Sequence, residues 1–178
     1  IISCVNEPNN KQVSPLGVMA QNYTLISNAD ELYYTISFQN TGNDTVNKVL
    51  IIDGFLYTLD PSTFRLINSS HPVEVQFLDY ATVSFTFNNI LLPDSSSNEV
   101  GSHGFVMYGI KPRVPILNNT IVVNSANIFF DENAAISTNI VRSVLVFEVL
   151  TGINTIGSSN GFGLVSLNPN PTTGNLSI

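Results

Sequence analysis

The chain has 178 residues, enough for one domain with a substantial core, and 43% of them are apolar. Only 11% are charged, and 13 acidic residues against 6 Lys and Arg give a net charge of −7, which disfavours nucleic acid and anionic lipid as partners. The apolar runs are much shorter than the roughly 18 residues of a membrane-spanning helix, and the only cysteine, Cys4, excludes an internal disulfide. We therefore expect a folded domain with no membrane insertion.

A two-residue alternation predicts the first strand, over residues 32–39. Leu32, Tyr34, Ile36 and Phe38 fall on one face, and the residues between them fall on the other. This pattern is typical of a strand with one buried face.

The clearest hairpin covers residues 73–87, with a turn at 79–81 between two alternating runs. Further strands are predicted at residues 46–53, 64–68, 104–110, 120–130 and 140–149, separated by clusters of Asn, Asp, Gly, Pro and Ser. The last strand is apolar on both faces, so we place it inside a sheet. No stretch has a convincing helical period. Many short strands at this spacing predict an all-β, antiparallel β-sandwich.

The composition changes after Leu150. Residues 151–163 are rich in Gly, Ser, Thr and Asn and have little to bury, as in a flexible linker. We predict a sandwich domain over residues 1–150, a linker over 151–163, and the start of a second unit over 164–178.

Seven stretches carry a family resemblance: Asn6–Pro15, Tyr34–Gly42, Ser62–Leu66, Ser69–Val73, Phe85–Asp94, Gly101–Phe105 and Ala126–Asp131. In order and spacing they resemble an immunoglobulin-like domain of unknown function from large secreted proteins of Bacteroidetes. The resemblance implies an immunoglobulin-like sandwich at the cell surface or outside the cell. The family usually opens with Asp-Pro-Asn-Asp-Lys, whereas this chain has Glu7 and Asn10 in place of the two acids, which weakens any metal role for that motif.

The closing residues 167–178 are similar to the first strand of a type A C-terminal sorting domain. The matching positions are Asn168, Pro169, Asn170, Pro171 and Gly174. The resemblance implies export by the type IX secretion machinery, and with it a secreted or surface location. Since nothing follows to pair with this strand, we expect the sorting domain to be truncated here.

No catalytic group is predicted. Ser102 and His103 are adjacent, but neighbours on a strand point to opposite faces, so we expect His103, like His71, to be structural. Four Asp residues are expected to cap backbone amides at strand ends or turns: Asp53, Asp60, Asp79 and Asp94.

Oxygen ligands near Asp131 suggest a weak calcium site, with Asp131, Asn133, Glu7 and Asn9 as its members, although turn capping is the favoured interpretation. No other cofactor is expected. Thr45, in Asp44-Thr45-Val46, fits an O-glycosylation pattern that the Bacteroidetes resemblance implies, in a loop that we expect to be exposed.

Lys11 and Asn139, near the first and last strands, raise the idea of an intramolecular Lys–Asn isopeptide bond. Such a bond needs a buried acid beside the pair, and a Lys is more often solvated.

The leading hypothesis is a non-enzymatic structural or spacer module. The alternative is a module that binds a glycan or a surface protein through its loops, with exposed Tyr57, Tyr80 and Tyr108 as candidate contacts.

Overall fold

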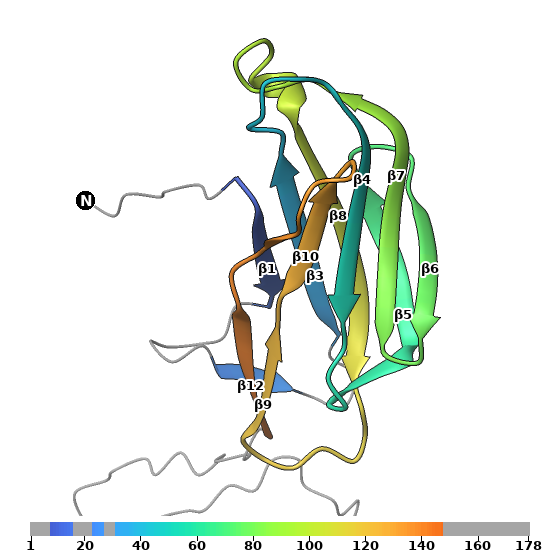
Figure 1. Cartoon of the computed structure of the whole chain (residues 1–178). Helices are drawn as coiled ribbons and strands as arrows, with labels where there is room; N and C mark the ends of the chain where they lie inside the picture. Colours follow the sequence, from blue (N-terminus) through green and yellow to red (C-terminus); the bar gives the residue numbers. More distant parts are fainter. Residues whose placement is uncertain (1–7, 16–22, 27–30, 148–178) are drawn as a thin grey trace, which may run out of the picture. The chain divides into compact units, whose positions relative to one another are not determined.

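The computed structural model describes residues 8–15, 23–26 and 31–147, which form the strands drawn in Figure 1. In chain order these are β1 (Asn10–Ser14), β2 (Tyr23–Ile26), β3 (Leu32–Gln39), β4 (Val46–Gly54), β5 (Leu59–Ser69), β6 (Glu74–Asp79), β7 (Thr82–Leu92), β8 (His103–Pro112), β9 (Thr120–Asn124), β10 (Ala126–Phe130), β11 (Ile136–Ser137) and β12 (Val141–Phe147). A 3-10 turn, η1 (Val100–Ser102), precedes β8. Within these ranges no helix is long and apolar enough to cross a membrane.

Two antiparallel sheets face each other. One has the order β1-β3-β8-β5 and the other β11-β10-β4-β7-β6; Figure 1 shows β3 and β8 in the layer behind β10, β4 and β7. Aromatic side chains from the two layers meet between them, with ring centroids of Phe38 and Phe87 5.2 Å apart and those of Phe85 and Tyr108 5.6 Å apart. The prediction of an all-β, antiparallel, immunoglobulin-like β-sandwich is confirmed.

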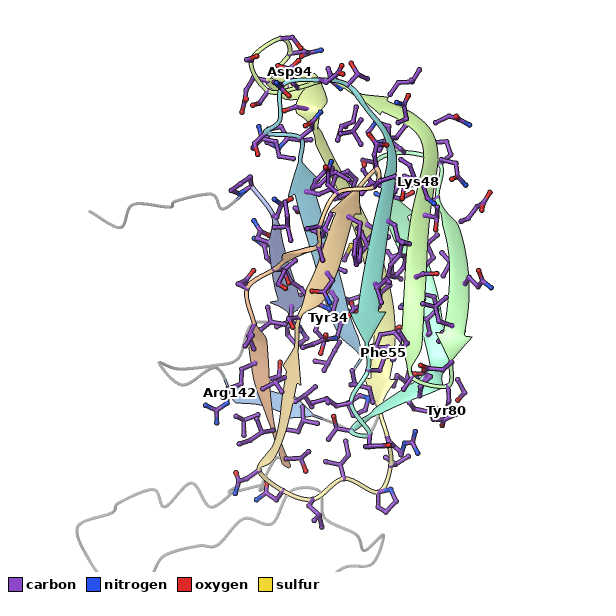
Figure 2. The ribbon with its side chains drawn as sticks, in the orientation of Figure 1. Tyr34, Lys48, Phe55, Tyr80, Asp94 and Arg142 are labelled. Carbon is purple, nitrogen blue, oxygen red and sulfur yellow. The ribbon has the colours of Figure 1, made fainter. Side chains whose placement is uncertain are left out.

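The alternating residues identified in the sequence form this core. Leu32, Ile36 and Phe38 are fully buried, as are Phe85 and Phe87 from the predicted hairpin. Figure 2 shows side chains filling the space between the two layers. Burial of apolar surface at about 25 cal/mol per Å² is the main force that holds the sheets together.

A third sheet has the order β2-β12-β9. The central position of β12 confirms that the last predicted strand lies inside a sheet. Its pairing with β2 is parallel, however, which is a departure from the antiparallel pattern elsewhere. The single strand predicted over residues 120–130 is divided at Ser125: β9 belongs to the third sheet and β10 to the second.

The strand β1 was not predicted, because it is short and carries one large apolar residue, Val13. It pairs with β3 in a register that places Lys11 opposite Ile36. Lys11 is buried and the next residue, Gln12, is exposed, so the Lys11 side chain points into the sandwich. The predicted linker and the sorting segment, residues 151–178, lie outside the described residues and stay predictions.

Candidate functional site

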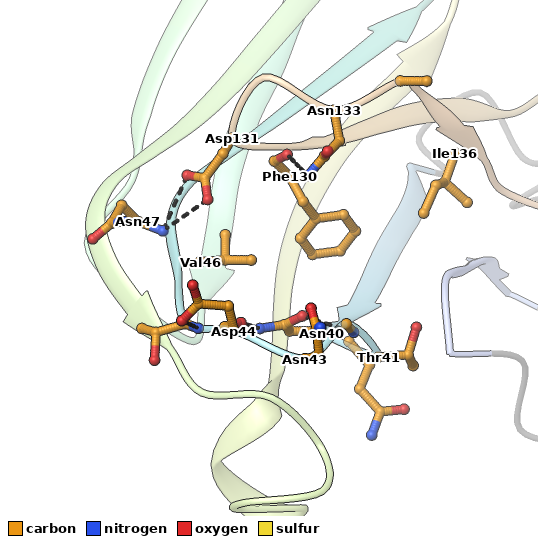
Figure 3. A pocket seen from close by; sticks show the side chains of 14 residues that line it. Asn40, Thr41, Asn43, Asp44, Val46, Asn47, Phe130, Asp131, Asn133 and Ile136 are labelled. Atoms are coloured by element: carbon orange, nitrogen blue, oxygen red, sulfur yellow. Dashed lines mark hydrogen bonds between the residues drawn. The ribbon is translucent and has the colours of Figure 1, made fainter.

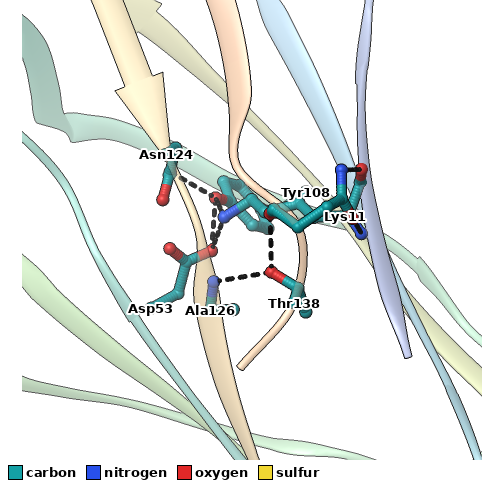
Figure 4. A network of polar contacts seen from close by, with 7 residues as sticks. Lys11, Asp53, Tyr108, Asn124, Ala126 and Thr138 are labelled. Atoms are coloured by element: carbon teal, nitrogen blue, oxygen red, sulfur yellow. Dashed lines mark hydrogen bonds and ion pairs between the residues drawn. The ribbon is translucent and has the colours of Figure 1, made fainter. Parts of the chain in front are cut away.

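A buried polar cluster lies between the sheets where the core is otherwise apolar (Figure 4). It consists of Lys11 from β1, Asp53 from β4, Tyr108 from β8 and Asn124 from β9. Each is at most 5% exposed. The expectations that Lys11 is solvated and that Asp53 caps a turn are both wrong: Lys11 is buried, and Asp53 lies within β4 with its side chain paired to Lys11.

The Tyr108 hydroxyl connects the members of this cluster. It donates a hydrogen bond to Asp53 Oδ2 over 2.7 Å. It also accepts one from Lys11 Nζ over 3.3 Å and one from Asn124 Nδ2 over 3.4 Å. The Lys11 amine, the Asp53 carboxylate and the Asn124 amide therefore all surround one oxygen atom.

Two aromatic rings lie close to the Lys11 amine. Its Nζ lies 4.9 Å from the ring centroid of Tyr34 and 5.6 Å from that of Tyr108, and the two rings stack 5.3 Å apart. Removal from water lowers the pKa of Lys11, and the charge and hydrogen bond of Asp53 only partly oppose this effect. Burial raises the pKa of Tyr108 well above its usual value, so its hydroxyl keeps its proton.

Two oxygen atoms of the cluster are unsatisfied. Asp53 Oδ1 and Asn124 Oδ1 are both buried, and neither has a hydrogen-bond partner in the described part of the chain. Figure 4 shows the Asn124 and Asp53 side chains pointing toward each other and toward Tyr108. A buried oxygen without a partner costs about 1–3 kcal/mol, so the arrangement needs a compensating reason.

Asn139 is not part of this cluster. Its side-chain amide pairs with the backbone of Lys11: Oδ1 accepts from Lys11 N over 2.8 Å, and Nδ2 donates to Lys11 O over 2.9 Å. The amide thus acts like a neighbouring strand and fixes β1 in place. The idea of a bond between the Lys11 amine and Asn139 is corrected accordingly.

Three of the four calcium ligands suggested by the sequence form hydrogen bonds with backbone groups. Asp131 Oδ1 accepts from Asn47 N over 3.0 Å and from Lys48 N over 2.8 Å, while Asn133 Nδ2 donates to Phe130 O over 2.8 Å. Asp131 thus binds backbone amides of β4, and Asn133 binds a carbonyl of its own turn. Asn9 Oδ1 accepts from Gln39 N over 3.3 Å, and Glu7 lies outside the described residues. The part of the chain that the structure describes has no group of three His, Cys, Asp or Glu suited to a metal ion.

Thr45 is exposed, as predicted, in the loop between β3 and β4. This loop and the turn after β10 border a surface depression of about 500 Å³ (Figure 3). Polar turn residues line most of it. Asp131 is one of them, and its carboxylate accepts a hydrogen bond from the backbone of β4. Whether Thr45 carries a glycan stays a prediction.

The remaining residues singled out in the sequence are surface or turn residues. His103 is exposed beside Glu99 while Ser102 is buried, so the two neighbours do point to different sides. Asp60, Asp79 and Asp94 each accept a hydrogen bond from the backbone amide two residues ahead, as expected.

An apolar surface lies at the end of the sandwich formed by three connections, residues 55–58, 80–81 and 113–119, which we call the loop end. Backbone hydrogen bonds join them: Phe55 N donates to Ala81 O over 2.6 Å, and Arg113 N donates to Thr58 O over 2.9 Å. Five of its apolar side chains are exposed: Leu56, Tyr57, Tyr80, Val114 and Leu117.

Of the three candidate tyrosines, two lie at the loop end. Tyr57 is 86% and Tyr80 64% exposed. The Tyr80 hydroxyl accepts from Arg113 Nη2 over 2.8 Å, and the Arg113 guanidinium lies 5.5 Å from the Tyr80 ring centroid, which restrains that ring. Tyr108 is fully buried, so its assignment as a surface contact is wrong. Its alternation with Val106 and Ile110 was the signal for an inward position.

The chain resembles bacterial surface domains in fold. The N-terminal domain of the Streptococcus gordonii adhesin Sgo0707 matches with a TM-score of 0.52 at 11% identity, over 80% of this chain and 33% of that one. The collagen-binding subdomain of the Enterococcus faecalis surface protein ACE matches with a TM-score of 0.45 at 10% identity, over 79% and 97% of the two chains. A collagen-binding domain from a Staphylococcus aureus adhesin matches with a TM-score of 0.45 at 11% identity, over 79% of this chain and 97% of that one.

No curated protein matches the chain. A family model does match, over residues 7–144, which include almost all of the described sandwich. The chain therefore belongs to the family described as a domain of unknown function, DUF7619.

Proposed function

We propose that this domain is a non-enzymatic structural module of a secreted or cell-surface protein. The observation that carries the proposal is the use of the ionisable side chains: Lys11, Asp53 and Tyr108 are sealed between the sheets. The acids in turns accept hydrogen bonds from their own loops. Such a domain resists unfolding and separates neighbouring parts of a longer protein, and a fold shared with an adhesin domain is consistent with this role.

The structural role is tested in the full-length protein, displayed on its own cell. Replacing residues 8–147 with an unrelated β-sandwich of similar length should preserve surface display and the activity of the neighbouring regions, whereas deleting these residues should impair both. Loss of activity on replacement, with the protein still displayed, would show that the domain has a specific role. Hydrolysis of any substrate by the purified chain would also overturn the proposal.

For export, we propose that residues 164–178 belong to a sorting segment read by the type IX secretion machinery. The support is the Asn168-Pro169-Asn170-Pro171 run with Gly174 after it. In a bacterium that has this machinery, deleting the chain from Leu164 onward should move the full-length protein from the cell exterior to the periplasm. Unchanged export after the deletion would exclude this route.

A second candidate function is binding of a glycan or a surface protein at the loop end. Exposed Tyr57 and Tyr80 favour it, because aromatic side chains supply large contact areas at low entropic cost and Tyr80 is already held by Arg113. The net charge makes nucleic acid an unsuitable partner.

The test is a glycan array and a panel of extracellular proteins, probed with the wild type and with Tyr57→Ala and Tyr80→Ala. Binding through the loop end should fall at least tenfold in each variant. Val100→Ser is the matched control, since Val100 is an equally exposed apolar residue, 88% accessible, in η1 outside the loop end. Equal loss in the control would exclude the loop end as the binding surface.

A further inference from the structure

The cluster around Tyr108 combines a nucleophile, an electrophile and an acid. The nucleophile is the Lys11 amine, which lies near the rings of Tyr34 and Tyr108 and whose charged form is disfavoured by its removal from water. The electrophile is the Asn124 amide, with a carbonyl oxygen that has no hydrogen-bond partner in the described part. The acid is Asp53, which pairs with Lys11 Nζ.

The topology brings these groups together from distant parts of the sequence. Ala126 lies directly opposite Asp53 in the pairing of β10 with β4, so Asn124, two residues earlier, ends β9 beside that carboxylate. Lys11 enters from β1, at the edge of the other sheet. Because the strands that carry them are held in three sheets, the reacting groups are kept in place without further ordering.

We propose that Lys11 and Asn124 form an intramolecular isopeptide bond, with Asp53 as the catalytic acid and Tyr108 as the bridge for proton transfer. The Lys11 ammonium first gives a proton to the Asp53 carboxylate. The neutral amine then attacks Asn124 Cγ while the Asp53 carboxylic acid polarises the Asn124 carbonyl. A proton from Nζ reaches Nδ2 through the Tyr108 hydroxyl, the Cγ–Nδ2 bond breaks, and ammonia leaves. The reaction needs no oxidant and consumes no water.

This scheme accounts for the two unsatisfied oxygens. A proton on the Asp53 carboxyl group turns one of two facing acceptors into a donor, which supplies the hydrogen bond that Asp53 Oδ1 and Asn124 Oδ1 both lack. Bonding of Lys11 to Asp53 instead would need a second carboxylic acid as catalyst, and Asp53 is the only acid in the cluster described above. Asn139 is excluded as the electrophile, because its amide is committed to the Lys11 backbone.

The test is the intact mass of the purified chain under denaturing conditions. The wild type should be lighter than its sequence mass by one ammonia, and a proteolytic digest should contain a branched peptide that joins Lys11 to Asn124. Asn124→Ala and Asp53→Asn should each have their full sequence mass. Asn88→Ala is the matched control: it removes an exposed amide of β7 outside the cluster and should retain the ammonia loss.

Each other outcome overturns the proposal. A full sequence mass for folded wild type means that no bond forms, whatever the variants do. A mass lower by one water places the bond at Asp53. A branched peptide that contains Asn139 makes the electrophile assignment wrong. Since the wild type alone decides between these outcomes, poor folding of a variant does not weaken the test.

Discussion

Asp94 organises the loop that follows β7, and its contacts make a pH-dependent contribution to stability. Oδ1 accepts hydrogen bonds from the Ser96 hydroxyl and from the backbone amides of Ser96 and Ser97, each amide at 3.0 Å, while Oδ2 accepts from the Ser97 hydroxyl over 2.7 Å. The serine hydroxyls, followed by the amides, lower the pKa of Asp94 to about 2. These donors prefer the ionised carboxylate.

Because the folded pKa lies below the unfolded value, the stabilisation from Asp94 is complete above about pH 4 and is lost as the pH falls toward 2. Asp94→Asn should therefore lower the melting temperature at neutral pH and flatten its decline between pH 4 and 2. Thermal unfolding followed by circular dichroism checks this. Asp44→Asn, which removes the same charge from an exposed loop, should leave the slope of the decline unchanged; an equal flattening there would contradict the assignment.

At the scale of elements, the contact between β3 and β8 depends on a glycine. Gly104 lies opposite Phe38, and a Cβ at this position would come within 2.2 Å of the Phe38 ring. That ring packs against Phe87 and Phe130 of the opposite sheet, with centroids 5.2 Å and 6.3 Å away. Because Gly104 has no side chain, the Phe38 ring has room to lie between the layers and contact the opposite sheet.

Gly104→Ala should destabilise the domain by about 1–3 kcal/mol, because Phe38 must leave its position or the strands must separate. Urea unfolding measures the change. Gly54→Ala is the matched control, since nothing lies within 4 Å of a Cβ built there at the end of β4, and it should be neutral or slightly stabilising. Similar midpoints for the two variants would mean that the Phe38 contact does not limit packing.

At the scale of the whole molecule, the sandwich was predictable because strands such as β3 carry a two-residue period of their own. The buried cluster was not, because its members gain meaning only from the pairing of strands far apart in sequence. Lys11 lies on a short edge strand with little alternation. Asp53 lies next to the end of β4, and Asp at such a position commonly caps a turn, so the sequence gives no sign that its side chain is buried. Only the pairing of Asp53 with Ala126 brings Asn124 beside Asp53 and the Tyr108 hydroxyl, which Lys11 also contacts, whereas Asn139 binds the Lys11 backbone.

The cluster also has a consequence for force applied along the chain. Lys11 lies in the first described strand and Asn124 just before β10, so a covalent bond between them closes a loop that contains most of the sandwich. Tension that enters from the N-terminal side passes through the bond and bypasses the strands in that loop. A module that separates parts of a surface protein benefits from this path, since the sheets then unfold little under load.

Single-molecule extension of the chain from its two ends measures this effect directly. With the bond in place, the roughly 110 residues between Lys11 and Asn124 cannot extend, so the contour length released on unfolding should be about 400 Å shorter than for the unlinked chain, at about 3.5 Å per residue. Asn124→Ala, which keeps the Lys11–Asp53 ion pair but removes the electrophile, should release the full length. Asn88→Ala, which removes an exposed amide of β7 outside the cluster, should behave as the wild type does. If the wild type and Asn124→Ala release the same length, no bond carries the force, and the buried cluster stabilises the fold only through its hydrogen bonds and ion pair.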